Sequence, residues 1–185
     1  MQITHLPTTM PILSFIAIDI PEAAYEQLLS VQKTILSCFP GVRRTPGFHI
    51  TLKFLGDVDE SRIADIKAAL ASVKFEPFEI RINGIGFFPS NKRINVVWVG
   101  ITSSGLLELQ KRIDNSLEGI FPREKDPVMH ITLGRVKFLT DRQLLIDTAK
   151  KLAVDCSFKA DGFKLKKSTL TKEGPVYEDI AVFKS

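Results

Sequence analysis

The first part of the chain shows two strand patterns, each followed by a helical pattern. Residues 13–20 form an apolar run that predicts a buried strand ending at Pro21, and residues 22–36 carry apolar side chains at helical spacing. Residues 48–55 alternate between apolar and polar side chains, as a half-buried strand does, and a glycine–aspartate turn follows them. Residues 60–70 are again helical in pattern. This order predicts two consecutive strand–helix units.

The rest of the chain mixes a hairpin with further units of this kind. Residues 78–88 and 94–100 predict two strands joined around Pro89-Ser90-Asn91, and Trp98 is expected to fill the core. The other predicted elements are a helix over 106–117 capped by Ser103 or Ser104, a strand over 128–136, a helix over 141–152, and two or three strands from residue 157 onward, with a break at 172–175. Interleaved hairpins and strand–helix units predict an α+β fold with mainly antiparallel sheets.

Length and composition limit the number of domains. The chain has 185 residues, of which 44% are hydrophobic and 25% charged, the mixture of an ordinary globular protein. This length suits one substantial core, or two small lobes that share a cleft, but not two independent domains. We therefore expect a single domain over residues 1–185.

The charge is only mildly basic and is spread along the chain. A net charge of +4 favours phosphate-bearing partners without requiring them, and the one modest cluster is Lys164, Lys166 and Lys167. This distribution fits a local phosphate site better than a surface that coats duplex nucleic acid.

Cys38 and Cys156 are far apart in sequence, so neither a disulfide framework nor a zinc knuckle is indicated, and a reducing cytoplasm is the expected compartment.

No export or membrane signal is expected from the start of the chain. Residues 1–10 lack a positively charged leader region. The apolar run of residues 12–20 is too short to span a bilayer and contains Asp19.

One tetrapeptide occurs twice. His-Ile-Thr-Leu stands at residues 49–52 and again at 130–133, 130 − 49 = 81 residues later, each time inside a predicted strand that a helix follows. The repetition indicates two diverged halves related by approximate two-fold symmetry. Such symmetry would bring the two copies of this strand face to face.

Strand geometry gives the repeated tetrapeptide a chemical meaning. Side chains alternate between the faces of a strand, so His49 shares a face with Thr51, and His130 with Thr132, while the isoleucine and leucine of each copy face the core. Two imidazoles and two hydroxyls can then surround one phosphate. Imidazole has an ordinary pKa of about 6.5, so one copy can act as a base and the other as an acid. Each threonine hydroxyl can donate to a non-bridging oxygen, where a well-placed donor is worth roughly 2.7–4 kcal/mol.

Other readings of the histidines are weaker. A single histidine beside a threonine in a strand is usually structural, but two of the three histidines of this chain share the same tetrapeptide, and His5 has no comparable context. A zinc site lacks an evident third ligand and an H-E-x-x-H motif. A serine or cysteine nucleophile lacks a G-x-S-x-G elbow or a reactive-cysteine signature.

Two cations next to the motifs are candidate substrate ligands. Lys53 has the same parity as His49, so it is expected either to face the phosphate or to lie solvated at the rim of the cleft. Arg135 has the opposite parity to His130 and reaches the cleft only if Gly134 introduces a bulge or the strand ends there. Aromatic side chains that could stack on a base are Phe48, Phe54, Phe87 and Phe88, although core packing is the commoner role for such residues.

Beyond these motifs, several segments resemble the two-histidine (2H) phosphoesterase superfamily, and specifically the archaeal and bacterial RNA 2′,3′-cyclic phosphodiesterases, also called 2′-5′ RNA ligases. The family motif is His-x-Thr/Ser-x, present twice. The similar segments are Phe15-Ile-Ala-Ile-Asp-Ile-Pro21, His49-Ile-Thr-Leu-Lys-Phe-Leu-Gly56, Val97-Trp-Val-Gly100, His130-Ile-Thr-Leu-Gly-Arg-Val136 and Gly174-Pro-Val-Tyr177. Residues 43–48 depart from the usual family pattern, so the substrate contacts on that side do not follow from the resemblance.

The resemblance implies a bilobal fold around a central cleft, with a first half of about residues 13–100, a second of about 101–185, and strands exchanged between the lobes. It implies hydrolysis of an RNA 2′,3′-cyclic phosphate to a 2′-phosphate, with a weak reverse 2′-5′ ligation. Neither a metal nor a cofactor is expected. By the same comparison, His49 is the proton donor to the departing 3′ oxygen and His130 the proton acceptor that activates water.

Two other functions compete with this one. A binding module could hold phosphorylated RNA ends or a nucleotide without turnover, although binding alone would not need groups that titrate near pH 7. A related phosphodiesterase could act on a small cyclic nucleotide or an ADP-ribose cyclic phosphate. The expected partner is single-stranded RNA with a 2′,3′-cyclic phosphate end, for example a tRNA fragment. A monomer is expected because one chain supplies both histidines.

Overall fold

The computed structural model describes residues 11–172 and 174–185. His5 and part of the expected break near residue 173 lie outside these residues. In chain order the elements are β1 (Ile12–Asp19), α1 (Glu22–Cys38), β2 (Val42–Arg44), β3 (His49–Val58), the 3-10 helix η1 (Glu60–Arg62), α2 (Ile63–Ala71), β4 (Phe78–Ser90), β5 (Arg93–Thr102), α3 (Leu106–Ser116), β6 (His130–Val136), α4 (Arg142–Lys151), β7 (Asp155–Ala160), β8 (Gly162–Thr171) and β9 (Gly174–Lys184).

The strands form two sheets. One has four strands in the order β3-β1-β8-β9, and the other has five in the order β2-β6-β5-β4-β7. Every strand pairing in the described part of the chain is antiparallel. The predicted α+β class with mainly antiparallel sheets is therefore confirmed. Each sheet combines strands from the first and second halves of the chain, since β8 and β9 join β1 and β3, while β6 and β7 join β2, β4 and β5.

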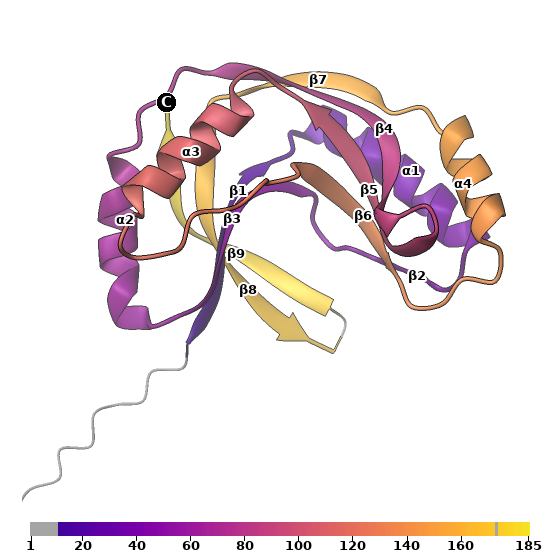
Figure 1. The fold of residues 1–185 in the computed structure, drawn as a ribbon, viewed down its shortest axis with the longest axis horizontal. Helices are drawn as coiled ribbons and strands as arrows, with labels where there is room; N and C mark the ends of the chain where they lie inside the picture. Colours follow the sequence, from indigo (N-terminus) through magenta and orange to yellow (C-terminus); the bar gives the residue numbers. More distant parts are fainter. Residues whose placement is uncertain (1–10, 173) are drawn as a thin grey trace, which may run out of the picture.

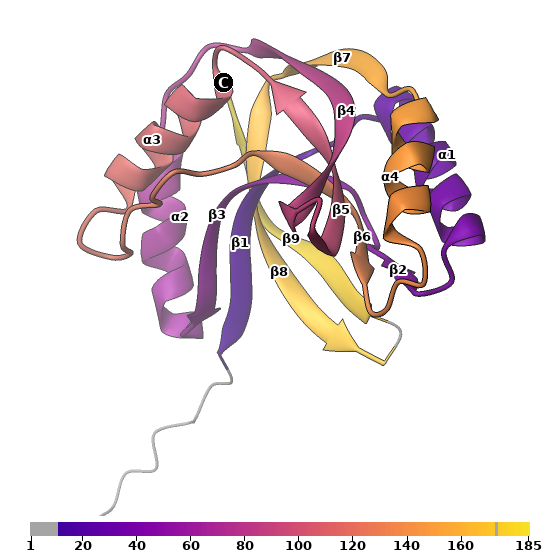
Figure 2. The ribbon, with the colours of Figure 1, turned by 45° about the vertical axis from the view of Figure 1, so that its right-hand side comes forward.

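Two helices cover each sheet. Helices α2 and α3 lie together beside the four-stranded sheet, and α1 and α4 lie together beside the five-stranded sheet (Figures 1 and 2). The connections cross between the lobes: α1 follows β1 of the first sheet but packs on β2, β6 and β7, and α3 follows β5 of the second sheet but packs on β3. The two lobes are therefore interlocked by their connections.

Apolar spacing explains why these segments adopt their structures. Helix α1 starts after Pro21, which suits a helix entry, and buries a stripe at Ala24, Leu28, Val31 and Ile35. Strand β1 lies inside its sheet and is buried at five consecutive positions, 14–18, as its continuous apolar run predicts. The core thus lies between each sheet and its two helices.

Two local predictions are wrong. Neither Ser103 nor Ser104 caps α3, because the N-cap residue is Gly105, and the Ser103 hydroxyl instead donates to the Glu79 carbonyl. Trp98 is half-buried rather than a core residue: its ring stacks on Phe88 at 4.9 Å and lies over Gly86, where a Cβ atom would stand 2.3 Å from it. The lack of a side chain at residue 86 makes room for the indole.

In the described residues, no helix combines the length and the apolar character needed to cross a membrane.

Candidate active site

The cleft between the two sheets contains both copies of the repeated motif. A cavity of about 590 Å³ is lined by His49 and Thr51 from β3 and by His130 and Thr132 from β6. Ile50 and Ile131 on the opposite faces of these strands are fully buried. The alternation predicted from the sequence therefore directs the four polar side chains into one cavity of a size typical for small-ligand sites.

The two motif strands carry matching β-bulges. In β3, Thr51 pairs with Ala17 and Lys53 with Ile16, so Leu52 has no partner in β1. In β6, Thr132 pairs with Trp98 and Gly134 with Val97 in β5, which leaves Leu133 unpaired in the same way. Each bulge inserts one residue and reverses the face of the residues that follow it. As a result, Phe54 and Arg135 line the cleft, whereas Lys53 and Gly134 do not.

Lys53 is the clearest correction to the sequence-based expectations. Its side chain is only 2% exposed, and its Nζ atom donates to Asp114 Oδ1 and to the Pro122 carbonyl, both at 2.6 Å. Lys53 therefore neither faces the phosphate nor lies solvated at the rim. Counting parity from His49 failed because the bulge at Leu52 reverses the faces of the strand.

Arg135 does reach the cleft, and the bulge before Gly134 is the reason. The short strand β2 packs closely over Gly134, where a Cβ atom would come within 2.7 Å of Val42 Cγ1 and 2.9 Å of the Arg43 carbonyl oxygen. A glycine at this position allows β2 to pair with β6 next to the site.

Each histidine ring hydrogen-bonds to the backbone of a preceding residue and lies against aromatic rings. His130 Nδ1 lies 2.7 Å from the Val128 carbonyl, and His49 hydrogen-bonds to the backbone of Gly47, in both cases two residues earlier in the chain. With Nδ1 donating to Val128, the Nε2 of His130 is the nitrogen available to act as a base. The rings around His49 are Phe15 at 4.9 Å and Tyr177 at 5.0 Å, and those around His130 are Phe88 at 4.9 Å and Trp98 at 6.2 Å.

The four candidate stacking phenylalanines divide evenly. Phe48 and Phe87 belong to the buried core, as the commoner role suggests. Phe54, which is 67% exposed, and Phe88 line the cleft. The cleft is also lined by Phe15, Arg44 and Tyr177, which were not predicted as site residues. Phe15 and Tyr177 stand in segments that resemble the family, whereas nothing in the sequence marked Arg44.

The electrostatic surroundings of His49 favour its neutral form in the empty cleft. Burial lowers the pKa of His49 from 6.5 to about 4, and the Lys166 ammonium acts in the same direction. The hydrogen bond to Gly47 and the Asp19 carboxylate oppose this shift, and His130 adds to it slightly. An anion bound next to the ring would work against the desolvation and raise the pKa.

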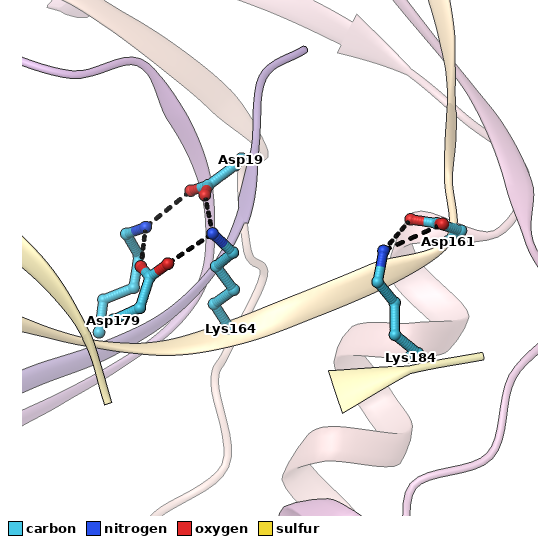
Figure 3. Close-up of polar contacts among 6 residues, drawn as sticks. Asp19, Asp161, Lys164, Asp179 and Lys184 are labelled. Carbon is cyan, nitrogen blue, oxygen red and sulfur yellow. Dashed lines mark hydrogen bonds and ion pairs between the residues drawn. The ribbon is translucent and has the colours of Figure 1, made fainter. Parts of the chain in front are cut away.

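Lys166 belongs to a ring of four charges beside the site. Lys164 binds both Asp19 and Asp179 (Figure 3), and Lys166 binds the same two carboxylates at 2.8 Å and 2.6 Å. Asp19 also pairs with His49 across β1 and β3. All three lysines of the modest basic cluster are therefore paired with carboxylates, since Lys167 Nζ lies 3.8 Å from Glu178 Oε2.

Among residues 11–172 and 174–185, no group of three or more His, Cys, Asp or Glu side chains is arranged so that it could hold a metal ion.

Two interlocked lobes that each present a His-x-Thr strand to one cleft define a phosphoesterase of the two-histidine class. The chain belongs to the LigT-like phosphoesterase family, whose model matches residues 18–98 and again residues 99–177. The resemblance seen in the sequence is therefore confirmed.

Similar proteins cover nearly the whole chain. The RNA 2′,3′-cyclic phosphodiesterase of Methanocaldococcus jannaschii is 39% identical over 169 residues, which is 90% of this chain and 96% of that protein. The protein of the same name from Archaeoglobus fulgidus is 35% identical over 175 residues, 91% of this chain and 98% of that protein. Among solved structures, TT0787 of Thermus thermophilus superimposes with a TM-score of 0.80 at 26% identity, covering 93% of this chain and 97% of that one.

Proposed function

We propose that the chain is an RNA 2′,3′-cyclic phosphodiesterase that hydrolyses a terminal 2′,3′-cyclic phosphate to a 2′-phosphate. The observation that carries the proposal is the convergence of two identical His-x-Thr strands on one cavity. The names of relatives that are 35–39% identical over nearly the whole chain support the same activity.

The mechanism follows from two imidazoles on opposing strands. His130 accepts a proton from water through Nε2, the water oxygen attacks phosphorus, and the bond from phosphorus to O3′ breaks. His49 donates its proton to O3′, so the products are a 3′-hydroxyl and a 2′-phosphate. In-line displacement places the attacking and leaving oxygens on opposite sides of phosphorus, which suits an acid and a base from different lobes. Proton exchange with solvent restores both histidines.

The remaining polar groups of the cleft have supporting roles in this proposal. Thr51 and Thr132 donate hydrogen bonds to the non-bridging oxygens, where negative charge concentrates in the transition state. Arg135 is the guanidinium on a motif strand that lines the cavity, and it binds the same anion. These assignments use side chains alone, without a metal or a cofactor.

The low pKa of His49 sets a condition on its role as the acid. In the empty cleft the ring is neutral at pH 7, so a protonated His49 must be stabilised by the substrate anion. Binding of the cyclic phosphate should therefore be accompanied by uptake of a proton. We expect kcat to follow a bell-shaped pH profile whose two apparent pKa values belong to the coupled pair, whereas a rate that only rises with pH would argue against the acid.

The direct test uses a short RNA that ends in a 2′,3′-cyclic phosphate, in excess EDTA, with the position of phosphate in the product determined. We expect wild type to yield a 2′-phosphate, and His49→Ala and His130→Ala to fold but to lose most of the activity. Loss of wild-type activity in EDTA would favour a metal-dependent reaction. Binding without turnover would favour the binding module.

A substrate with sulfur in place of the 3′ bridging oxygen separates the two roles. A thiolate leaves without needing a proton, so an acid variant regains rate on this substrate and a base variant does not. We expect His49→Ala to be rescued and His130→Ala to remain inactive. The opposite pattern would exchange the two assignments.

Reverse 2′-5′ ligation, a monomeric state and a cytoplasmic location complete the proposal. Both histidines come from one chain, so the cavity requires no second copy. RNA fragments with cyclic ends, such as tRNA halves, are the proposed substrates.

The LigT-like family model matches the chain twice, which supports an origin from two repeated halves, of about residues 13–100 and 101–185, with strands exchanged between the lobes.

A further inference from the structure

Three arginines lie together at the edge of the five-stranded sheet where it borders the cleft. Arg43 and Arg44 are on the edge strand β2, and Arg135 is on the neighbouring strand β6. Arg44 and Arg135 line the catalytic cavity. We refer to Arg43, Arg44 and Arg135 as the arginine edge.

The pairing of the two strands brings like charges together. Arg43 is directly opposite Arg135 in the antiparallel ladder, so both side chains project from the same face of the sheet. Like charges at directly opposite positions are unfavourable unless an anion lies between them. None of the three arginines has a carboxylate within ion-pair distance in the described part of the chain, whereas Arg81, Arg112 and Arg123 are each paired with one.

The backbone of the arginine edge is tied to the motif strand β6 at both ends of β2. The buried Gln32 side chain donates to the carbonyls of Thr45 and Leu133, at 3.1 Å and 2.7 Å, and so ties the end of β2 to β6. At the other end of β2, the Lys137 amide donates to the Gly41 carbonyl at 2.8 Å. The backbone that carries these exposed arginines is therefore fixed, so only their side chains lose conformational freedom when they bind an anion.

Two members of the arginine edge, Arg43 and Arg44, lie outside the strands that carry the motif residues. His130 and Thr132 are on β6, and β2 lies one strand further out, about 4.8 Å in strand spacing. The cavity at the motif strands already contains two histidines, two threonines and Arg135 for a single phosphate. Arg43 shares the face of Arg135, and Arg44, which is the last residue of β2, lines the cavity, so both are suited to a second anionic group of the same ligand.

We propose that Arg43 and Arg44 bind the phosphodiester that precedes the terminal nucleotide, so that the site selects oligoribonucleotides over cyclic mononucleotides. This inference rests on the proposed function and narrows its substrate class. Arginines on an edge strand can also prevent that strand from pairing with the sheet of another molecule. That role would not require Arg44 to line the catalytic cavity, as it does.

The test compares two substrates: adenosine 2′,3′-cyclic phosphate, which has no preceding phosphodiester, and a tetraribonucleotide with a 2′,3′-cyclic end. The measured quantity is the ratio of kcat/KM for the tetranucleotide to kcat/KM for the mononucleotide. In R43Q/R44Q we expect this ratio to fall about tenfold for each phosphate contact that is lost. The dependence of log kcat/KM on log salt concentration for the tetranucleotide should become shallower by about 0.7 per contact.

The matched control is K33Q/K67Q, which removes the same net charge from exposed lysines on α1 and α2, away from the cleft. The control should leave the ratio unchanged, and the single variants R43Q and R44Q divide the effect between the two arginines. An unchanged ratio in R43Q/R44Q, or an equal fall in the control, would overturn the proposal. Equal losses on both substrates would also overturn it, because they would place the arginines at the reacting phosphate.

A binding measurement separates this inference from the proposed function. If wild type hydrolyses neither substrate, the proposed function fails, and fluorescence anisotropy with a labelled tetranucleotide ending in a 2′-phosphate still tests the arginine edge. Weaker binding and a shallower salt dependence in R43Q/R44Q than in K33Q/K67Q would support the edge. Equal binding by both variants would overturn it.

Discussion

Replacing Lys53 with Met tests whether this lysine is structural. The ammonium and its partner Asp114 are almost completely buried, with 2% and 6% of their side chains exposed, so Lys53→Met leaves a buried carboxylate without its counter-ion. Breaking a buried pair from one side typically costs 3–5 kcal/mol. Asp114 keeps hydrogen bonds from Gln110 Nε2 and from the Glu124 amide, so we expect a value near the lower end, about 3 kcal/mol.

The assay is thermal and urea unfolding at neutral pH. At this chain length 1 kcal/mol shifts Tm by about 2–4 °C, so Lys53→Met should lower Tm by roughly 6–12 °C. Asp114→Asn in the same chain should recover part of the loss, because it removes the unpaired charge. Lys184→Met provides the matched control, since it breaks an exposed ion pair with Asp161 (Figure 3) and should change Tm little.

An unchanged Tm together with a raised KM for RNA would refute this reasoning. That result would mean that Lys53 contacts the substrate, as its parity in the strand first suggested. We expect instead that Lys53→Met, assayed well below its Tm, keeps the KM of wild type.

Three further results should follow. The His49 pKa of about 4 lies below its ordinary 6.5, so the unfolded chain binds the extra proton between these values and stability falls as pH falls from 6.5 to 4. At about 1.4 kcal/mol per pKa unit, wild type should lose about 3 kcal/mol more over this range than His49→Asn in urea unfolding; equal losses would contradict the shift. Lys166→Met should raise the NMR titration midpoint of His49 more than Lys164→Met does, because Lys166 is the lysine whose charge acts on the ring, and equal midpoints would exclude this role. Gly134→Ala should cost roughly 1–3 kcal/mol in thermal unfolding, since its Cβ would stand 2.7 Å from Val42 Cγ1, and a neutral result would mean that β2 shifts freely.

The sequence predicted those features that depend on the residues of a single strand or helix. Apolar periodicity located both motif strands and helices α1 to α4, and alternation placed the histidine and the threonine of each motif on the same face of their strand. A β-bulge is a property of two paired strands, so the bulge at Leu52 was not predicted, and the one at Leu133 was raised only as a condition for Arg135 to reach the cleft. The three-residue strand β2 was not predicted for a similar reason. It forms because it pairs with β6, where Gly134 leaves room for it.

The two identical motifs have different surroundings, which come from residues that do not belong to them. The residue across from His49 is Asp19, a carboxylate that binds Lys166, whereas the residue across from His130 is Gly100. After the matching bulges, β3 places Phe54 in the cleft and β6 places Arg135 there. An acid and a base must differ in proton affinity, and two copies of one tetrapeptide cannot supply that difference by themselves. The neighbouring strands place different charges beside the two related motifs. The role of each histidine therefore depends on the residues around it rather than on the motif itself.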